Sequence, residues 1–220
     1  MPLLIRAPGL PEGVHRRQPV VNADLAPTIL DFAHAEPGRV EDGQSLIPIM
    51  RNPLYWPGRG IDLEAWGNPV KQRQEFHPPL VFRGVRTDRY MYADYGGGQR
   101  ELYDLRKDPY ELQNAASDPA YARVSAALAR LLAVLTNCAG ETCRERPDLS
   151  LRVESCTTAQ VTGTGNPQDA TFYLSGRRIG LVDRPPIRIR LPSGSSSAQL
   201  EAVATSLDGR TVSLKRKLHC

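Results

Sequence analysis

The sequence predicts an α+β protein, in which an antiparallel sheet packed by one helix is followed by a small all-β, sandwich-like domain. Three observations predict this fold class. Apolar and polar residues alternate from residue 80 to residue 105, as in strands with one buried face. Apolar residues recur at helical spacing over residues 121–135. Short apolar runs separated by Gly-, Pro- and Ser-rich turns then fill residues 149–218.

Composition and charge limit the class of protein. The 220 residues are 40% hydrophobic and 24% charged, which is typical of a folded protein rather than a disordered one. A net charge of +4 and a pI of about 9.0 favour anionic ligands, such as sulfated or phosphorylated polymers. The densest basic clusters, 184–190 and 215–217, are interpreted as solvated strand faces. With no nucleic-acid motif and no apolar run of about 18 residues, neither a nucleic-acid partner nor a membrane span is expected.

Residues 1–50 combine a short strand, a helix and an apolar segment. The strand is predicted at residues 2–6. Asp24 is predicted to cap a helix that has Pro27 in its first turn. Three apolar residues share one face of that helix: Leu25, Ile29 and Phe32. Residues 51–79 are rich in Pro, Gly, Trp and Arg and are predicted to form one long irregular loop, which is usually functional or disordered.

Residues 80–144 carry the alternating pattern and the helix. Strands are predicted over 80–86, 90–95 and 101–105 as an antiparallel meander. Asp108 has the capping-box spacing to Glu111, and Asp118-Pro119 repeats the helix-start signal before the main helix. Four tyrosines are interpreted as packing between sheet and helix rather than as a sugar platform: Tyr90, Tyr92, Tyr103 and Tyr110.

Residues 148–220 are predicted to form the β-sandwich-like appendage. The expected strands are 149–156, 171–174, 187–191, 200–205 and 211–218. Asp208-Gly209 is a hairpin signal between the last two strands.

The four cysteines indicate an oxidising compartment, although the first residues have no basic segment and too short an apolar run for a signal peptide. Four cysteines allow three pairings. We favour Cys138 with Cys143 and Cys156 with Cys220, because each bond then closes one local unit. A zinc site is the rival, but the spacing fits no zinc finger.

Three stretches occur in a particular order and spacing. The first runs Pro2-Leu-Leu-Ile-Arg-Ala-Pro-Gly and continues with Asp24-Leu-Ala-Pro-Thr-Ile-Leu-Asp and Asp42-Gly-Gln-Ser-Leu-Ile-Pro. The second is Gly84-Val-Arg-Thr-Asp-Arg-Tyr, and the third is Glu101-Leu-Tyr-Asp-Leu-Arg-Lys-Asp-Pro-Tyr-Glu-Leu. Together they resemble the sulfatase family, in particular the branch similar to N-acetylglucosamine-6-sulfatase. The resemblance covers residues 1 to about 144.

The resemblance implies a partial alkaline-phosphatase-like fold. Residues 1–50 would be the tail end of the α/β core, 51–79 a long loop, 80–144 the C-terminal subdomain and 148–220 an appendage. In the full-length family, a formylglycine made from a Cys/Ser-x-Pro-x-Arg signature attacks sulfur, and a divalent cation, usually calcium, holds the sulfate. Cationic side chains neutralise the ester where charge develops.

The catalytic parts that the family requires are not found in this sequence. No cysteine precedes x-Pro-x-Arg, and Ser117-Asp-Pro-Ala-Tyr121 has tyrosine where the signature needs arginine. There is no Asp-Asp pair. We therefore expect no catalytic residue and no metal ligand in this chain, an internal start relative to the family, and inactivity alone. The expected partner is the missing N-terminal catalytic portion, in a full-length protein that is secreted, periplasmic or at the cell surface.

The resemblance also places this region beside the substrate. The long loop is the candidate wall, with aromatic and charged residues that would contact a sulfated glycan or aryl sulfate: Trp56, Trp66, Arg59, Lys71, Arg73 and His77. The leading hypothesis is the C-terminal portion of a sulfuric ester hydrolase that acts on sulfated sugars. The alternatives are a non-catalytic carbohydrate-binding or structural module, and a related phosphoester or phosphonate hydrolase.

Overall fold

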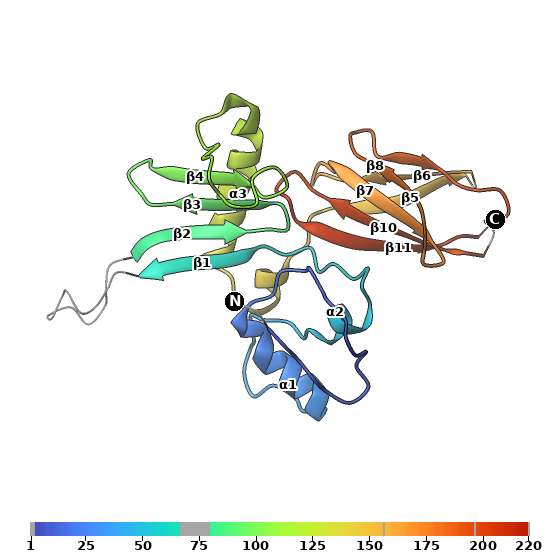
Figure 1. The fold of residues 1–220 in the computed structure, drawn as a ribbon, viewed down its shortest axis with the longest axis horizontal. Helices are drawn as coiled ribbons and strands as arrows, with labels where there is room; N and C mark the ends of the chain where they lie inside the picture. The colour runs from blue at the N-terminus through green and yellow to red at the C-terminus, as the bar shows by residue number, and fades with distance from the viewer. Residues whose placement is uncertain (1–2, 67–79, 156, 196, 220) are drawn as a thin grey trace, which may run out of the picture.

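The computed structural model describes residues 3–66, 80–155, 157–195 and 197–219. Two β units lie side by side, and a helical N-terminal segment lies against the edge of the first (Figure 1). Four antiparallel strands form the first unit, which is backed by a helix, and two further sheets form the second. The predicted α+β character is confirmed.

The first sheet has the order β1-β2-β3-β4, with β1 Ile61–Trp66, β2 Leu80–Arg86, β3 Tyr90–Asp94 and β4 Arg100–Asp104. The predicted three-strand meander was incomplete, because β1 lies within the expected irregular loop. Its residues Ile-Asp-Leu-Glu-Ala-Trp alternate as a half-buried strand should. Only residues 67–79 of that loop lie outside the described part of the chain.

One helix covers one face of this sheet (Figure 1). It is α3 Ala122–Leu135, preceded by the short 3-10 helix η3 Pro119–Tyr121. The Asp118 carboxylate accepts a hydrogen bond from the Ala120 amide, which confirms the second start signal. Around the Asp108 signal the chain forms a turn instead, in which the Asp108 carboxylate accepts from the Gln113 amide and Glu111 has φ 57°. The core contains residues of both layers, among them Val85, Tyr92, Leu102, Leu128 and Leu132.

The N-terminal segment holds η1 Asn22–Asp24, α1 Leu25–Ala33 and α2 Ile47–Arg51. The described residues 3–6 form no strand. Asp24 is the residue before α1, but its carboxylate makes no cap bond to that helix. It accepts instead from the Val21 and Gln44 amides and from Arg59.

The second unit packs two antiparallel sheets over one core. One sheet has the order β11-β10-β7-β8 and the other β5-β6-β9. Their bounds are β5 Ser150–Ser155, β6 Thr158–Thr162, β7 Asp169–Leu174, β8 Arg177–Val182, β9 Arg188–Arg190, β10 Gln199–Thr205 and β11 Thr211–Lys217. β6 and β8 were not predicted. Val161, Phe172 and Leu200 are among the residues buried between the sheets.

The two β units are joined by polar bonds and close packing. The Thr211 amide donates to the Asp88 carboxylate at 2.6 Å. Arg106 donates to Asp169 at 2.6 Å and to the Thr205 hydroxyl at 3.1 Å. Because these bonds come from the β2–β3 turn and the segment after β4, they tie the first sheet to strands β7, β10 and β11.

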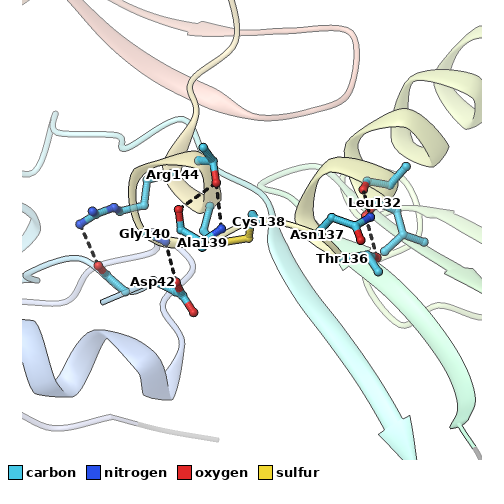
Figure 2. Close-up of a disulfide and its surroundings, with 12 residues drawn as sticks. Asp42, Leu132, Thr136, Asn137, Cys138, Ala139, Gly140 and Arg144 are labelled. Carbon is cyan, nitrogen blue, oxygen red and sulfur yellow. Dashed lines mark hydrogen bonds between the residues drawn. A yellow bond between two sulfur atoms is a disulfide. The ribbon is translucent and has the colours of Figure 1, made fainter. Parts of the chain in front are cut away.

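The predicted Cys138–Cys143 disulfide is present, and it closes a short loop directly after α3 that contacts the N-terminal segment (Figure 2). Within its loop, which includes η4 Gly140–Arg144, the Gly140 amide donates to Asp42 at 2.7 Å. Arg144 donates to the Gly43 carbonyl at 2.9 Å. The predicted Cys156–Cys220 bond lies outside the described residues.

Candidate substrate-facing surface

The face of the first sheet turned away from α3 is the candidate substrate-facing surface, and we call it the open face. Alternation assigns its residues, because side chains paired across strands lie on the same side of the sheet. Val85, Tyr92 and Leu102 are packed with α3, so the intervening residues face away from it. The open face therefore carries Phe82, Arg86, Met91, Tyr95, Glu101 and Tyr103.

Aromatic rings and a carboxylate gather at one end of the open face. The ring centroids of Phe82 and Tyr95 are 5.3 Å apart. Partial burial, and then the adjacent Glu101 carboxylate, raise the pKa of Tyr95 and of Tyr103 above the usual phenol value. Both phenols therefore stay protonated at neutral pH, which keeps their O–H groups available as hydrogen-bond donors.

Two half-exposed arginines lie on opposite sides of β2, because they are three residues apart in the strand. Arg86, on the open face, donates to Glu111 at 2.9 Å. Arg83, on the helix side, pairs with Glu64 of β1 at 3.1 Å. The nearby carboxylates Asp88, Asp94 and Asp104 bond instead to the Thr211 amide, Arg100 and Arg89.

Of the predicted loop residues, the structure describes Trp56, Arg59 and Trp66, which lie in three different surroundings. Trp66, at the end of β1, is 52% exposed and stays available. Trp56 is half-buried at the junction of the two β units, where its carbonyl accepts from the Ser213 amide. Lys71, Arg73 and His77 lie outside the described residues.

Arg59, which was expected to contact substrate, is buried inside the protein. Its side chain is only 4% exposed, and both terminal nitrogens donate to the fully buried Asp24 carboxylate. The guanidinium therefore neutralises a buried charge and joins the start of α1 to the segment before β1. The sequence around Arg59 gave no signal of this burial, because the partner, Asp24, lies 35 positions away.

The tyrosines divide between the two faces of the sheet. Tyr90 and Tyr92 are buried against α3, as expected. Tyr103 lies on the open face, and Tyr110 is 81% exposed, so the packing interpretation was wrong for these two. Phe82, Tyr95 and Glu101 were not singled out from the sequence, although counting parity from Val85 and Leu102 would have placed them opposite the helix.

Within the described residues no group of three His, Cys, Asp or Glu side chains could hold a metal ion. Both cysteines of the 138–143 loop are oxidised to a disulfide. The described residues therefore do not fit a calcium site, the two disulfide-bonded cysteines do not fit a formylglycine precursor, and no step of such chemistry is assigned to them. No described helix is both long enough and apolar enough to cross a membrane.

Comparison with known proteins assigns the family. Residues 1–137 match the family described as "N-sulphoglucosamine sulphohydrolase, C-terminal". The chain belongs to this sulfatase family. The match includes the N-terminal segment, the whole first sheet and α3, whereas the two-sheet unit that begins at β5 lies beyond it.

Curated relatives agree with this sulfatase assignment. The chain is 30% identical over 133 residues to a Delta 4,5-hexuronate-2-O-sulfatase of Bacteroides thetaiotaomicron, covering 57% of this chain and 26% of the relative. It is 27% identical over 173 residues to human N-acetylglucosamine-6-sulfatase, covering 66% and 31%. A multifunctional alkaline phosphatase superfamily protein, PehA of Trinickia caryophylli, is 30% identical over 120 residues, covering 45% and 21%. The chain thus spans about a quarter of the length of the relatives it matches.

Among solved structures, a putative sulfatase from Bacteroides thetaiotaomicron is 31% identical and has a TM-score of 0.42. That alignment covers 56% of this chain and 28% of the solved one.

Proposed function

We propose that this chain is the C-terminal portion of a sulfuric ester hydrolase that acts on sulfated sugars, and that it has no turnover alone. The observation that carries the proposal is the sulfatase family match over residues 1–137, together with alignments that cover only about a quarter of the curated relatives' length. In this proposal the nucleophile and the calcium ion of the family belong to the N-terminal catalytic portion, and the present residues bind that portion and the substrate.

Exposed apolar residues on the N-terminal segment support the first role. Ile29 of α1 is 66% exposed, and Leu25 on the same helix face is also uncovered. An amphipathic helix normally buries this face against a core. Apolar residues clustered on one exposed surface are typical of a protein–protein contact. We assign this surface to the catalytic portion.

The open face and Trp66 support the second role. Sugar-binding walls combine aromatic rings with a few hydrogen-bonding groups of fixed orientation. Phe82, Tyr95 and Tyr103 supply rings, and Glu101 and the Arg86–Glu111 pair supply polar groups. Trp66 extends the same sheet toward residues 67–79, where His77 and Arg73 remain proposed substrate contacts.

Co-expression tests the proposal directly. The 220-residue chain is purified alone and together with the product of the reading frame upstream, and both are assayed for sulfate release from N-acetylglucosamine-6-sulfate. We expect release only from the pair, and its loss on chelation. Chelator-sensitive turnover by the chain alone would contradict the proposal.

A matched pair of variants tests the docking surface. Ile29→Glu is expected to reduce co-purification of the catalytic portion at least tenfold, because a carboxylate would be buried in the contact. Leu181→Glu on β8 is the control, since Leu181 is similarly exposed at 53% but lies on the other unit. Equal retention of the partner by both variants would remove α1 from the interface.

A related phosphoester hydrolase is the second candidate, and the match to the alkaline phosphatase superfamily relative favours it. The co-expressed pair is therefore also assayed with a phosphate monoester and a phosphonate monoester. Higher kcat/KM for either than for the sulfate ester would replace the sulfatase proposal by this one. We also propose export to an oxidising compartment, because the Cys138–Cys143 bond would be reduced in the cytosol.

A further inference from the structure

A cleft lies where the two β units meet, and we call it the junction cleft. Its volume is about 260 Å³. One wall is the outer side of α3, a second is the segment after the disulfide, and the others are the β6–β7 and β10–β11 turns. The two turns lie beyond the sulfatase family match, so the second β unit creates this cleft by docking on α3.

The charges around the junction cleft favour an anion. Three arginines line it, against two carboxylates. The Asp208 carboxylate is already paired with Arg210, which donates two hydrogen bonds to it at 3.0 and 2.8 Å. Arg130 is exposed and has no ion pair or hydrogen bond with any residue that the structure describes. Its guanidinium therefore offers five donors without first breaking an internal pair.

The other groups of the cleft suit a sugar ring. Val134 of α3, which is 45% exposed, gives one side an aliphatic surface next to the nearly buried Leu131, and the C–H face of a pyranose can pack against such a surface. Asn166, in the β6–β7 turn, has φ 50° and a side-chain amide with no bond to the described residues. An arginine beside an apolar surface and an amide from another wall of the cleft are groups that can hold one anionic sugar unit in a fixed orientation.

The walls are held in place independently of any ligand. Arg210 also donates to the Glu145 carbonyl at 2.7 Å, which fixes the β10–β11 turn to the segment after the disulfide. The Leu207 amide donates to the Gly165 carbonyl at 3.0 Å, which joins the two turns. Little conformational freedom would be lost on binding, so even a few contacts can contribute affinity.

From this geometry we propose that the junction cleft binds one sulfated sugar unit, separate from the open face, with Arg130 on the sulfate and Asn166 on the ring hydroxyls. The choice of a sulfated sugar rests on the proposed function. The cleft would hold a second unit of a sulfated chain and thereby keep a polymeric substrate attached between turnovers.

The test uses the full 220-residue chain and a titration with N-acetylglucosamine-6-sulfate followed by ¹H–¹⁵N NMR. We expect saturable shifts at the amides of Asn166 and Thr164, and about tenfold weaker binding after Arg130→Ala. The control is Arg123→Ala, because Arg123 is also an exposed arginine of α3 but does not line the cleft. Asn166→Gly is the second variant, since glycine accepts the positive φ while the amide is removed.

Each other outcome overturns the proposal. Equal weakening by Arg123→Ala and Arg130→Ala would show general charge attraction. Inorganic sulfate binding as tightly as the sugar sulfate would show a simple anion site. Unsulfated N-acetylglucosamine binding equally well would remove the role of Arg130. Binding to the cleft requires no catalysis, so the two proposals can fail separately. No binding to the cleft, with turnover by the co-expressed pair, would refute only the cleft proposal. Binding to the cleft, without turnover by the pair, would refute only the proposed function.

Discussion

At the scale of single residues, Asp88 has an unfavourable environment for its charge. Its Oδ2 accepts the Thr211 amide at 2.6 Å, whereas its Oδ1 is enclosed and has no partner among the described residues. Burial raises the pKa of this carboxyl to about 7, although the Thr211 bonds and Arg106 act in the opposite direction. The carboxylate that joins the two β units is therefore partly protonated at neutral pH.

The Asp88→Asn variant is expected to remove a pH dependence of stability. Below about pH 4 the carboxyl is protonated in both folded and unfolded chains. Between about 4 and 7 only the unfolded chain ionises, so the free energy of unfolding of the wild type falls as pH rises, and the loss is complete above 7. We expect the variant to be more stable than wild type by about 2 kcal/mol at pH 8, allowing for solvent screening, and nearly equal at pH 4.

Urea unfolding at pH 4 and pH 8 measures this difference. Asp183→Asn is the control, because that carboxylate is 72% exposed and should show no such change. If Asp88→Asn lowered the free energy of unfolding equally at pH 4 and pH 8, the Asp88 carboxylate would act only as a hydrogen-bond acceptor.

At the scale of elements, the segment after α3 is held mainly by tertiary bonds. The Cys138–Cys143 disulfide closes a short loop, and that loop reaches the N-terminal segment through Gly140 and Arg144 (Figure 2). The hydrogen bonds of this loop therefore join the end of α3 to the N-terminal segment.

Replacing both cysteines by alanine is expected to lower the free energy of unfolding by about 2 kcal/mol. The reason is that the unfolded chain gains conformational entropy when so short a loop is no longer closed. Thermal unfolding with and without dithiothreitol measures the effect. The reductant should lower the melting temperature of the wild type to that of the double variant and leave the variant unchanged. A wild type that does not respond to a reductant able to reach the bond would show that the disulfide adds nothing to stability.

At the scale of the whole molecule, the close contact between the β units depends on a glycine. Gly209, in the β10–β11 turn, has φ +81°. A Cβ there would lie 2.5 Å from a Tyr90 ring carbon and 2.7 Å from the Thr87 hydroxyl. The turn reaches the first unit's core only because this position has no side chain.

Gly209→Ala is therefore expected to separate the two units, and Gly176→Ala is its matched control. Gly176 has nearly the same φ, +82°, but nothing lies within 4 Å of its Cβ position. Both changes add backbone strain of about 1–2 kcal/mol, and only the first adds a clash. Calorimetry should show one transition for wild type and the Gly176 variant, and two for the Gly209 variant. Two transitions in neither variant, or in both, would contradict this account of the junction.

The sequence by itself determined the α+β class, the helix α3, the strands of the first meander and the Cys138–Cys143 pair, because each depends on periodicity or on neighbours close in the chain. Local patterns also predicted the apolar face of α1, but not that it would stay exposed. Only the tertiary structure decided that Arg59 neutralises Asp24 and that two turns close a cleft on α3. These outcomes depend on which distant segments pack together. The type of a residue does not predict which partner, tens of residues away in the chain, it will contact.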